Sequence, residues 1–208
     1  MLCLNNLKRF CIFVIIDYRY MKRFLILALT LFFSLPSFAQ EEHLKFKGIS
    51  MKGNIGGFIE GLMDKGFDIS TTTTTCVMME GEFLGNPSTN VAVYPNPSTK
   101  NTAMVVAFVE AGYTWESLEK KYIDVVKLYS DRYGEPTQQD KYFDGDANTS
   151  FQKLRRIRES KCRYATSWIM RQGVITIMFL YSDGNYFVTC SYFDSANAAE
   201  ERNIIDDI

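Results

Sequence analysis

The most regular hydrophobic pattern in the chain lies between Thr114 and Tyr133. Thr114 is a suitable N-cap, and Gly134 and Pro136 end the pattern. The spacing of three and four residues predicts a helix whose largely aromatic stripe packs into the core. The stripe consists of Trp115, Leu118, Tyr122, Val125, Tyr129 and Tyr133.

A shorter stripe predicts another helix between Asn54 and Gly66, with Asn54 as its N-cap and Gly66 just past its end. Three glycines inside this helix each cost about 1 kcal/mol relative to alanine. Packing must therefore stabilise the helix, and a glycine would let its backbone approach a sheet closely. Before it, alternation at Leu44 and Phe46 predicts a short strand.

The other hydrophobic runs have the period of strands. Three runs, "CVMMEGEFLG", "NVAVYPNP" and "NTAMVVAFVE", lie between the two helices, after an exposed strand or loop at Thr71–Thr75. Four more follow the second helix: "QDKYFDG", "CRYATSWIM", "VITIMFLY" and "YFVTCSYF". This order predicts an α+β fold of two tandem units, each a helix followed by an antiparallel meander (αβββ then αββββ), with the helix across one sheet face.

Residues 1–39 have the pattern of a signal segment. Lys22 and Arg23 precede the apolar run 24–38, and small residues allow cleavage after Ala39. We expect the true start at Met21, and we expect a periplasmic or secreted protein. The expected domains are the signal segment 1–39, a single α+β domain over 40–193 and a polar tail over 194–208.

The net charge of the chain and the length of its apolar run limit the kinds of partner that we expect. The chain has 23 basic and 24 acidic residues, of which five basic and one acidic residue lie in the signal segment, so the remainder carries a net charge of about −5. This sign argues against nucleic acid as a partner. The apolar run is too short to span a bilayer, so we expect no stable membrane span after cleavage.

Cysteine and histidine are scarce in the expected mature chain. His43 is the single histidine, which excludes metal sites built from several histidines and disfavours triad hydrolases. We expect no metal and no cofactor. Cys162 and Cys190 are predicted on strands about 9.5 Å apart, which disfavours a bridge between them. Cys76 remains a candidate for a disulfide.

Several segments resemble a group of uncharacterised small secreted proteins of Bacteroidetes. The resemblance is carried by "HLKFKGISMKG", "FIEGLMDKGF", "EGEFLGNPSTNVAVYPNP", "YSDRYGEPTQ" and the hairpin "YSDGNYFVTCSYFD". The repeated layout of helix and meander is also similar to beta-lactamase inhibitor protein-like domains and to the small outer-membrane assembly lipoproteins. The resemblance implies export and an α+β fold, and it implies no catalytic chemistry.

Two sets of residues are candidates for binding. Strand aromatics left uncovered by the helices would form a partner surface, because tyrosine and tryptophan dominate interface hot spots. The candidates are Trp168, Tyr164, Tyr186 and Tyr192. A basic run with Arg155, Arg156 and Arg158 is a candidate for anionic glycan or lipid phosphate.

The leading hypothesis is an exported, non-enzymatic binding domain whose partner is an envelope or extracellular protein. One alternative is a carboxylate-dependent glycan-active enzyme using Asp144, Asp146 or Glu110. The other is an anionic glycan- or lipid-phosphate-binding module. The segment "DGDANTSFQKLR" has only the beginning of a calcium loop, so we predict a solvated turn there.

Overall fold

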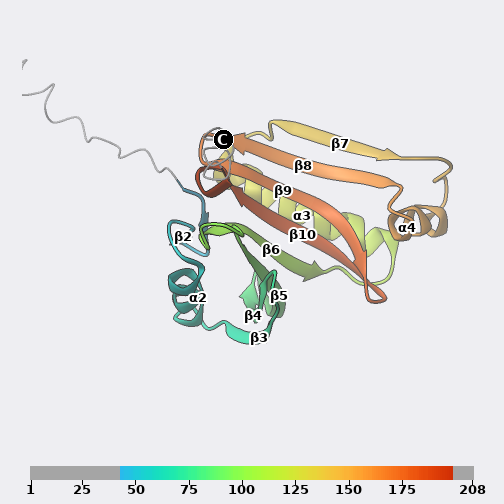
Figure 1. Ribbon diagram of the computed structural model, residues 1–208. Coiled ribbons are helices and arrows are strands. Elements are labelled where there is room, and N and C mark those ends of the chain that lie inside the picture. Colours follow the sequence, from blue (N-terminus) through green and yellow to red (C-terminus); the bar gives the residue numbers. More distant parts are fainter. Residues whose placement is uncertain (1–42, 199–208) are drawn as a thin grey trace, which may run out of the picture. The chain divides into compact units, whose positions relative to one another are not determined.

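Eight antiparallel strands form the main sheet of the computed structural model, which describes residues 43–198 (Figure 1). The sheet order is β3-β4-β5-β6-β10-β9-β8-β7, so two four-stranded meanders meet where β6 pairs with β10. A separate two-stranded hairpin precedes them. The elements are β1 Lys45–Phe46, β2 Ile49–Ser50, α2 Ile55–Met63, β3 Asp68–Thr72, β4 Val77–Phe83, β5 Asn86–Pro95, β6 Thr102–Glu110, α3 Trp115–Tyr133, β7 Gln138–Phe143, α4 Ser150–Arg158, β8 Cys162–Met170, β9 Gly173–Ser182 and β10 Asn185–Asp194.

The predicted α+β class and the two predicted helices are confirmed. Asn54 caps α2 by accepting a hydrogen bond from the Gly56 amide, and Thr114 caps α3 through the Ser117 amide. Within α2, a Cβ on Gly61 would lie 3.1 Å from the Ile49 side chain of β2. This glycine lets the helix backbone pack closely against the small hairpin.

The predicted strand count of the first meander was wrong. It has four strands, because part of the threonine run pairs with β4 as the edge strand β3. Every residue of β3 is exposed, so the strand lacks the alternation that reveals a half-buried strand.

The predicted solvated turn was also wrong where α4 begins. The helix has the capping box Thr149–Gln152, in which Thr149 accepts from the Gln152 amide and the Gln152 side chain accepts from the Thr149 amide. Only Ile157 of this helix is buried, so its apolar stripe is too sparse to indicate a helix. The capping box is the signal that could have found it.

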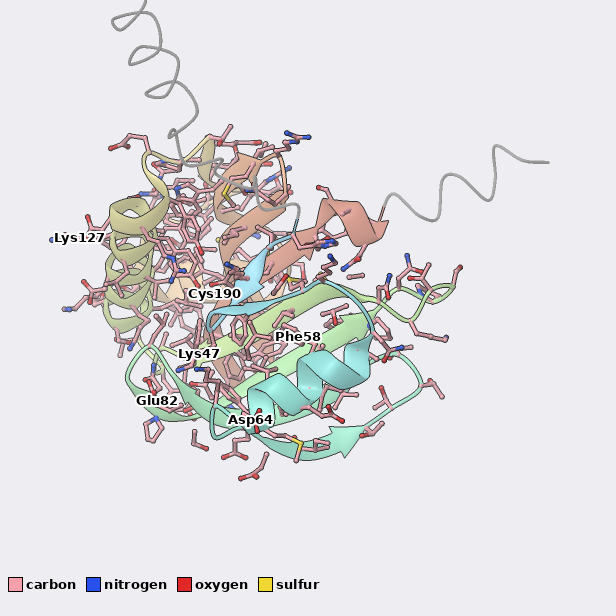
Figure 2. The ribbon with its side chains drawn as sticks, turned by 90° about the vertical axis from the view of Figure 1, so that its left-hand side faces the viewer. Lys47, Phe58, Asp64, Glu82, Lys127 and Cys190 are labelled. Carbon is pink, nitrogen blue, oxygen red and sulfur yellow. The ribbon has the colours of Figure 1, made fainter. Side chains whose placement is uncertain are left out.

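The helices and the small hairpin lie on the same face of the main sheet. Trp115 and Tyr122 of α3 contact Phe179 of β9 at ring-centroid distances of 5.7 and 5.0 Å. Phe46 of β1 contacts Tyr192 of β10 at 5.2 Å. Figure 1 shows α3 along one side of β8–β10, and Figure 2 shows Phe58 between α2 and the strands. One continuous core therefore lies on the helix side of the sheet.

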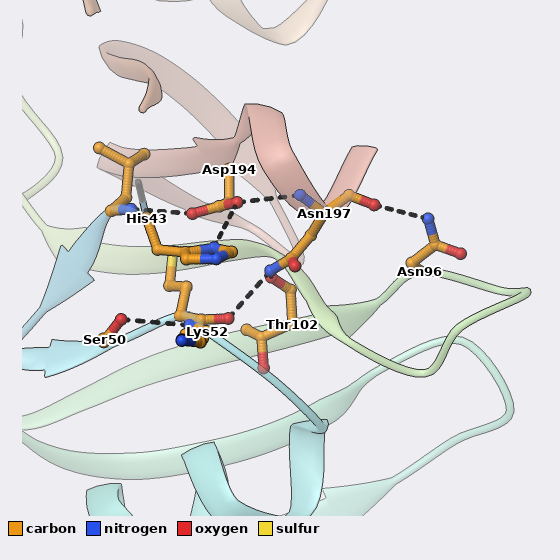
Figure 3. Close-up of polar contacts among 9 residues, drawn as sticks. His43, Ser50, Lys52, Asn96, Thr102, Asp194 and Asn197 are labelled. Atoms are coloured by element: carbon orange, nitrogen blue, oxygen red, sulfur yellow. Dashed lines mark hydrogen bonds and ion pairs between the residues drawn. The ribbon is translucent and has the colours of Figure 1, made fainter. Parts of the chain in front are cut away.

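A buried polar network joins distant parts of the chain (Figure 3). The Asp194 carboxylate is fully buried and accepts hydrogen bonds from the amides of Leu44 at 2.8 Å and Asn197 at 3.0 Å. His43 Nδ1 lies 3.2 Å from the same carboxylate. We expected a polar tail from Asp194 onward; Asp194 instead ends β10 inside this network, and residues 195–198 are helical.

No helix within residues 43–198 combines the length and the apolar character needed to cross a membrane. The predicted signal segment and most of the predicted tail lie outside the described residues.

Candidate functional site

The face of the main sheet opposite the helices carries many apolar side chains. Residues alternate between the two faces of a strand, so the neighbours of buried core residues point to this side. We call this surface the open face. It comprises Met104, Val106 and Phe108 of β6, Phe187, Thr189, Ser191 and Phe193 of β10, Val174, Thr176, Met178 and Leu180 of β9, and Ile169 of β8.

Several large apolar side chains of the open face are exposed to solvent. The exposed fractions are 55% for Ile169, 42% for Phe193, 41% for Met178 and 36% for Leu180. These values distinguish the open face from the helix side, where every core side chain of β9 is less than one tenth exposed. Groups of exposed large apolar side chains are typical of interaction sites in folded proteins.

Strand register arranges the open face in rows across the sheet. Met104, Phe193 and Val174 are paired neighbours, and Ile169 pairs with Val174, so one row is entirely apolar. A second apolar contact joins Phe108 and Phe187, whose rings meet edge to face at a centroid distance of 6.0 Å.

Hydroxyl groups separate these apolar groups. Ser191 pairs with Thr176, which pairs with Ser167, and the hydroxyls of Ser167 and Thr176 are 3.0 Å apart. Thr189 Oγ1 donates to the Met178 carbonyl at 3.2 Å. The middle of the open face therefore offers apolar contacts with a few hydroxyl groups and carries no charge.

Charged residues occur only toward the margins. On the β7–β8 side, Arg163 Nε lies 3.4 Å from the Asp140 carboxylate, so this cation already has an internal partner. On β6, the exposed Glu110 ends the strand.

Two hollows extend over this side of the sheet. One of about 410 Å³ is lined by Met78, Phe108 and Phe187 together with polar residues of β3 and the β9–β10 turn. The other, of about 820 Å³, lies over β7–β9 and is lined by Asp140, Arg163, Met178 and their neighbours. The open face therefore has a hollow toward each of its two sides.

The aromatic residues predicted as the partner surface lie on the opposite side. Trp168 and Tyr186 are each 2% exposed, Tyr192 is 5% exposed, and Tyr164 is half-buried. They pack under α3 and α4, so the prediction that these aromatics form an exposed surface was wrong.

Internal hydrogen bonds explain why these polar aromatics tolerate burial. Trp168 Nε1 donates to the Gly134 carbonyl at 2.8 Å. The hydroxyls of Tyr192 and Tyr129 bond each other, and burial holds the pKa of both phenols above their ordinary value.

The residues that do face outward occupy the alternate positions on the same strands. Phe187, Phe193, Met178 and Leu180 were not among the predicted site residues. No signal in the sequence identified these positions, because both sets of alternate strand positions carry apolar residues. The packing of α3 against one side of the sheet leaves the other side uncovered.

The predicted arginine patch is divided among internal partners. Arg155 Nε and Arg156 Nη1 donate to Glu159 at 2.6 and 3.0 Å. Arg158 Nε bonds the Tyr186 hydroxyl, and its guanidinium lies over the Tyr181 ring at 5.2 Å. Hydrogen bonding from Arg155, assisted by Arg156 and Lys161, lowers the pKa of Glu159. The three arginines therefore do not converge on a shared anion site.

The carboxylates considered for glycan chemistry are also separated. Glu110 ends β6, whereas Asp144 and Asp146 lie in the loop after β7, four strand positions away in the sheet. Four strand spacings are about 19 Å, well beyond the roughly 5–9.5 Å between paired carboxylates of glycosidases. Residues 43–198 contain no group of three His, Cys, Asp or Glu side chains placed to hold a metal ion.

The three cysteines of the described region are free. Cys190 is buried and Cys162 is partly buried. Burial raises the pKa of the Cys190 thiol to about 12 and that of Cys162 to about 11. Both remain protonated near neutral pH and are poor nucleophiles.

Comparison of this chain with protein-family models, with curated proteins and with solved structures found no significant match.

Proposed function

We propose that this chain is a non-enzymatic binding domain whose open face holds another protein. The observation that carries the proposal is the uncovered apolar side of the sheet, with Phe193, Met178 and Ile169 exposed on adjacent strands. Burying such side chains against a partner is favourable by about 25 cal/mol for each Å² of apolar surface removed from water.

The chemistry of the open face favours a protein over other macromolecules. Its outward residues on β6, β10 and β9 are uncharged up to the terminal Glu110. Nucleic acids and anionic glycans require cationic groups, and Arg163 is paired with Asp140. An apolar protein surface, with a few polar groups that meet the hydroxyls, complements this face.

The size of the sheet also suits a protein partner. Strand β9 has ten residues, which extend about 33 Å, and the four strands of the open face span about 19 Å. Their product is about 630 Å², which is somewhat below the roughly 800 Å² that each partner buries in a standard interface. A small molecule would leave most of this surface in water.

Site-specific crosslinking in cells that make the protein tests the proposal. A photo-crosslinking amino acid replaces Met178 on the open face or, as a control, Lys127 on the outer side of α3. We expect one discrete adduct from position 178 and none from position 127. The captured protein is then identified and purified, and its affinity for the domain is measured.

Matched variants make the binding measurement decisive. Phe193→Asp should weaken binding of the identified partner at least tenfold, because a charge would be buried in an apolar contact. Ile123→Asp also removes an exposed apolar side chain, but from α3, and should leave binding unchanged. Equal effects of both variants in folded protein would refute the proposal. So would an adduct made only of two copies of this chain.

We further propose that the domain is exported to the periplasm or secreted, as the pattern over 1–39 suggests. Mass spectrometry of the mature protein should find an N-terminus at Gln40. The proposed tandem origin is supported by the order of the sheet, in which each half supplies four neighbouring strands that follow a helix, with α4 inserted between β7 and β8 of the second half. Membership of the Bacteroidetes group remains a prediction from the sequence.

A further inference from the structure

A small cationic pocket lies on the helix side of the molecule, away from the open face. It has a volume of about 260 Å³ and is built by the β1–β2 hairpin, the β4–β5 turn and the second half of α3. Lys45 and Lys47 come from the hairpin, and Arg132 comes from α3. No carboxylate occurs among the described residues that line it.

The body of the pocket is apolar and aromatic. Leu84 lines one side, and Tyr129 and Tyr192 contribute rings that lie 6.2 Å apart at their centroids. Both tyrosines are at most 5% exposed, and their hydroxyls are occupied by bonding each other. The small exposed parts of these two tyrosines therefore offer ring carbon atoms rather than free hydroxyl groups to a ligand.

The cations are held at the pocket by neighbouring groups. Lys47 Nζ donates to the Glu82 carbonyl at 3.0 Å and lies 3.4 Å from the Glu82 carboxylate. Arg132 lies over the ring of Tyr133 at 5.3 Å. Glu82 is exposed and offsets the charge of Lys47, whereas no carboxylate that lines the pocket offsets the charge of Arg132. Figure 2 shows Lys47 and Glu82 near each other, and Lys127 pointing away from α3.

From this arrangement we propose that the pocket binds a small amphiphilic carboxylate, with an aromatic or short aliphatic body. The carboxylate pairs with Arg132 and Lys47, since a guanidinium matches both oxygens of a carboxylate. The body packs between Leu84 and the rings of Tyr129 and Tyr192. A space of 260 Å³ equals about nine water volumes, which suits a single ring with a short chain.

The same chemistry occurs in a free acid and in the C-terminus of a peptide that ends in phenylalanine. The two sources differ in what must extend from the pocket to solvent. A free acid needs no exit path, whereas a peptide must run out over the exposed Leu128 at the pocket margin. Parallel titrations with both kinds of ligand distinguish them.

Nuclear magnetic resonance titration of the intact mature domain tests the inference. The probes are 3-phenylpropanoate, its uncharged amide, 3-phenylpropylammonium, and a tripeptide that ends in phenylalanine. We expect saturable shifts of the amide signals around Tyr129 with the propanoate. The neutral amide should bind at least tenfold more weakly, and the ammonium ion should not bind, because the charge-assisted hydrogen bonds are lost. Tighter binding of the tripeptide than of the free acid would identify a chain terminus as the source.

Single substitutions test whether the cations of the pocket, rather than the overall charge of the protein, bind the ligand. Arg132→Gln and Lys47→Gln should each weaken propanoate binding about tenfold or more, with little change for the amide. Lys127→Gln removes a cation from the outer side of the same helix and should have no effect. Thermal unfolding of each variant confirms that it folds. Equal affinities for acid and amide, shifts confined to the open face, or no saturable shift at millimolar concentration would each overturn the proposal.

Discussion

Replacing Asn197 by alanine should destabilise the domain strongly, although the residue lies near the end of the described chain. Its side-chain nitrogen donates to the carbonyls of Met51 at 2.9 Å and Thr102 at 2.7 Å (Figure 3). Asn197 itself is 2% exposed. The variant leaves two buried acceptors without this donor, and each loss costs about 1–3 kcal/mol.

We expect a total loss of about 3 kcal/mol, because partial entry of water offsets some of the cost. For a domain of roughly 150 residues, this loss lowers the melting temperature by about 6–12 °C. Urea unfolding, followed by the fluorescence of the buried residues Trp115 and Trp168, measures the free energy directly. The slope with urea should stay unchanged, because the same surface becomes exposed on unfolding.

Two further variants control this measurement. Asn148→Ala removes an exposed side chain and should change stability by less than about 0.5 kcal/mol. Asn197→Asp should be at least as damaging as Asn197→Ala, because a carboxylate oxygen would face two carbonyl oxygens. If Asn197→Ala and Asn148→Ala prove equally stable, the network does not hold these segments together and the reasoning fails.

Four other predictions follow from buried groups. Thr102 Oγ1 is buried without a hydrogen-bond partner among the described residues, so Thr102→Val should stabilise the domain by about 1 kcal/mol in the same urea assay. Gly173→Ala should cost about 3 kcal/mol or more, because φ is 152° there and a Cβ would lie 2.0 Å from the Phe193 carbonyl oxygen; normal stability would contradict this packing. Burial raises the pKa of Tyr122 to about 12, so the unfolded chain loses this proton near pH 10 before the folded chain does. Stability should therefore fall as pH rises from 10 to 12, and the fall should be smaller in Tyr122→Phe. Cys190 should resist iodoacetamide at pH 8 until urea unfolds the chain, as peptide mass mapping would show; rapid labelling of folded protein would contradict its burial.

The open face illustrates how far sequence patterns reach. Strand alternation predicted that one parity of each strand would remain uncovered. It did not reveal which parity, because the strands carry apolar residues on both sides: Trp168 has Ile169 beside it, and Tyr192 has Phe193. The choice depends on which sheet face the aromatic stripe of α3 packs against, and that is a contact between segments far apart in the chain.

Short-range sequence signals were sufficient to predict the two main helices. The N-caps Asn54 and Thr114, together with the helical spacing of the apolar residues that follow each cap, predicted α2 and α3. These interactions join residues that lie only a few positions apart in the chain. Weak local signals failed: β3 is exposed throughout, and α4 buries only one residue. Their positions follow from strand pairing and from contacts with α3.

The sequence by itself determined the α+β class and the two main helices. Only the tertiary structure decided that β6 pairs with β10, that Asp194 and Asn197 join the two ends of the domain, and that Lys47 and Arg132 line the same pocket. The physical reason is the distance along the chain between the residues that interact. Hydrophobic period and capping act between near neighbours, whereas sheet closure, buried polar networks and pockets depend on groups that the chain brings together only when it folds.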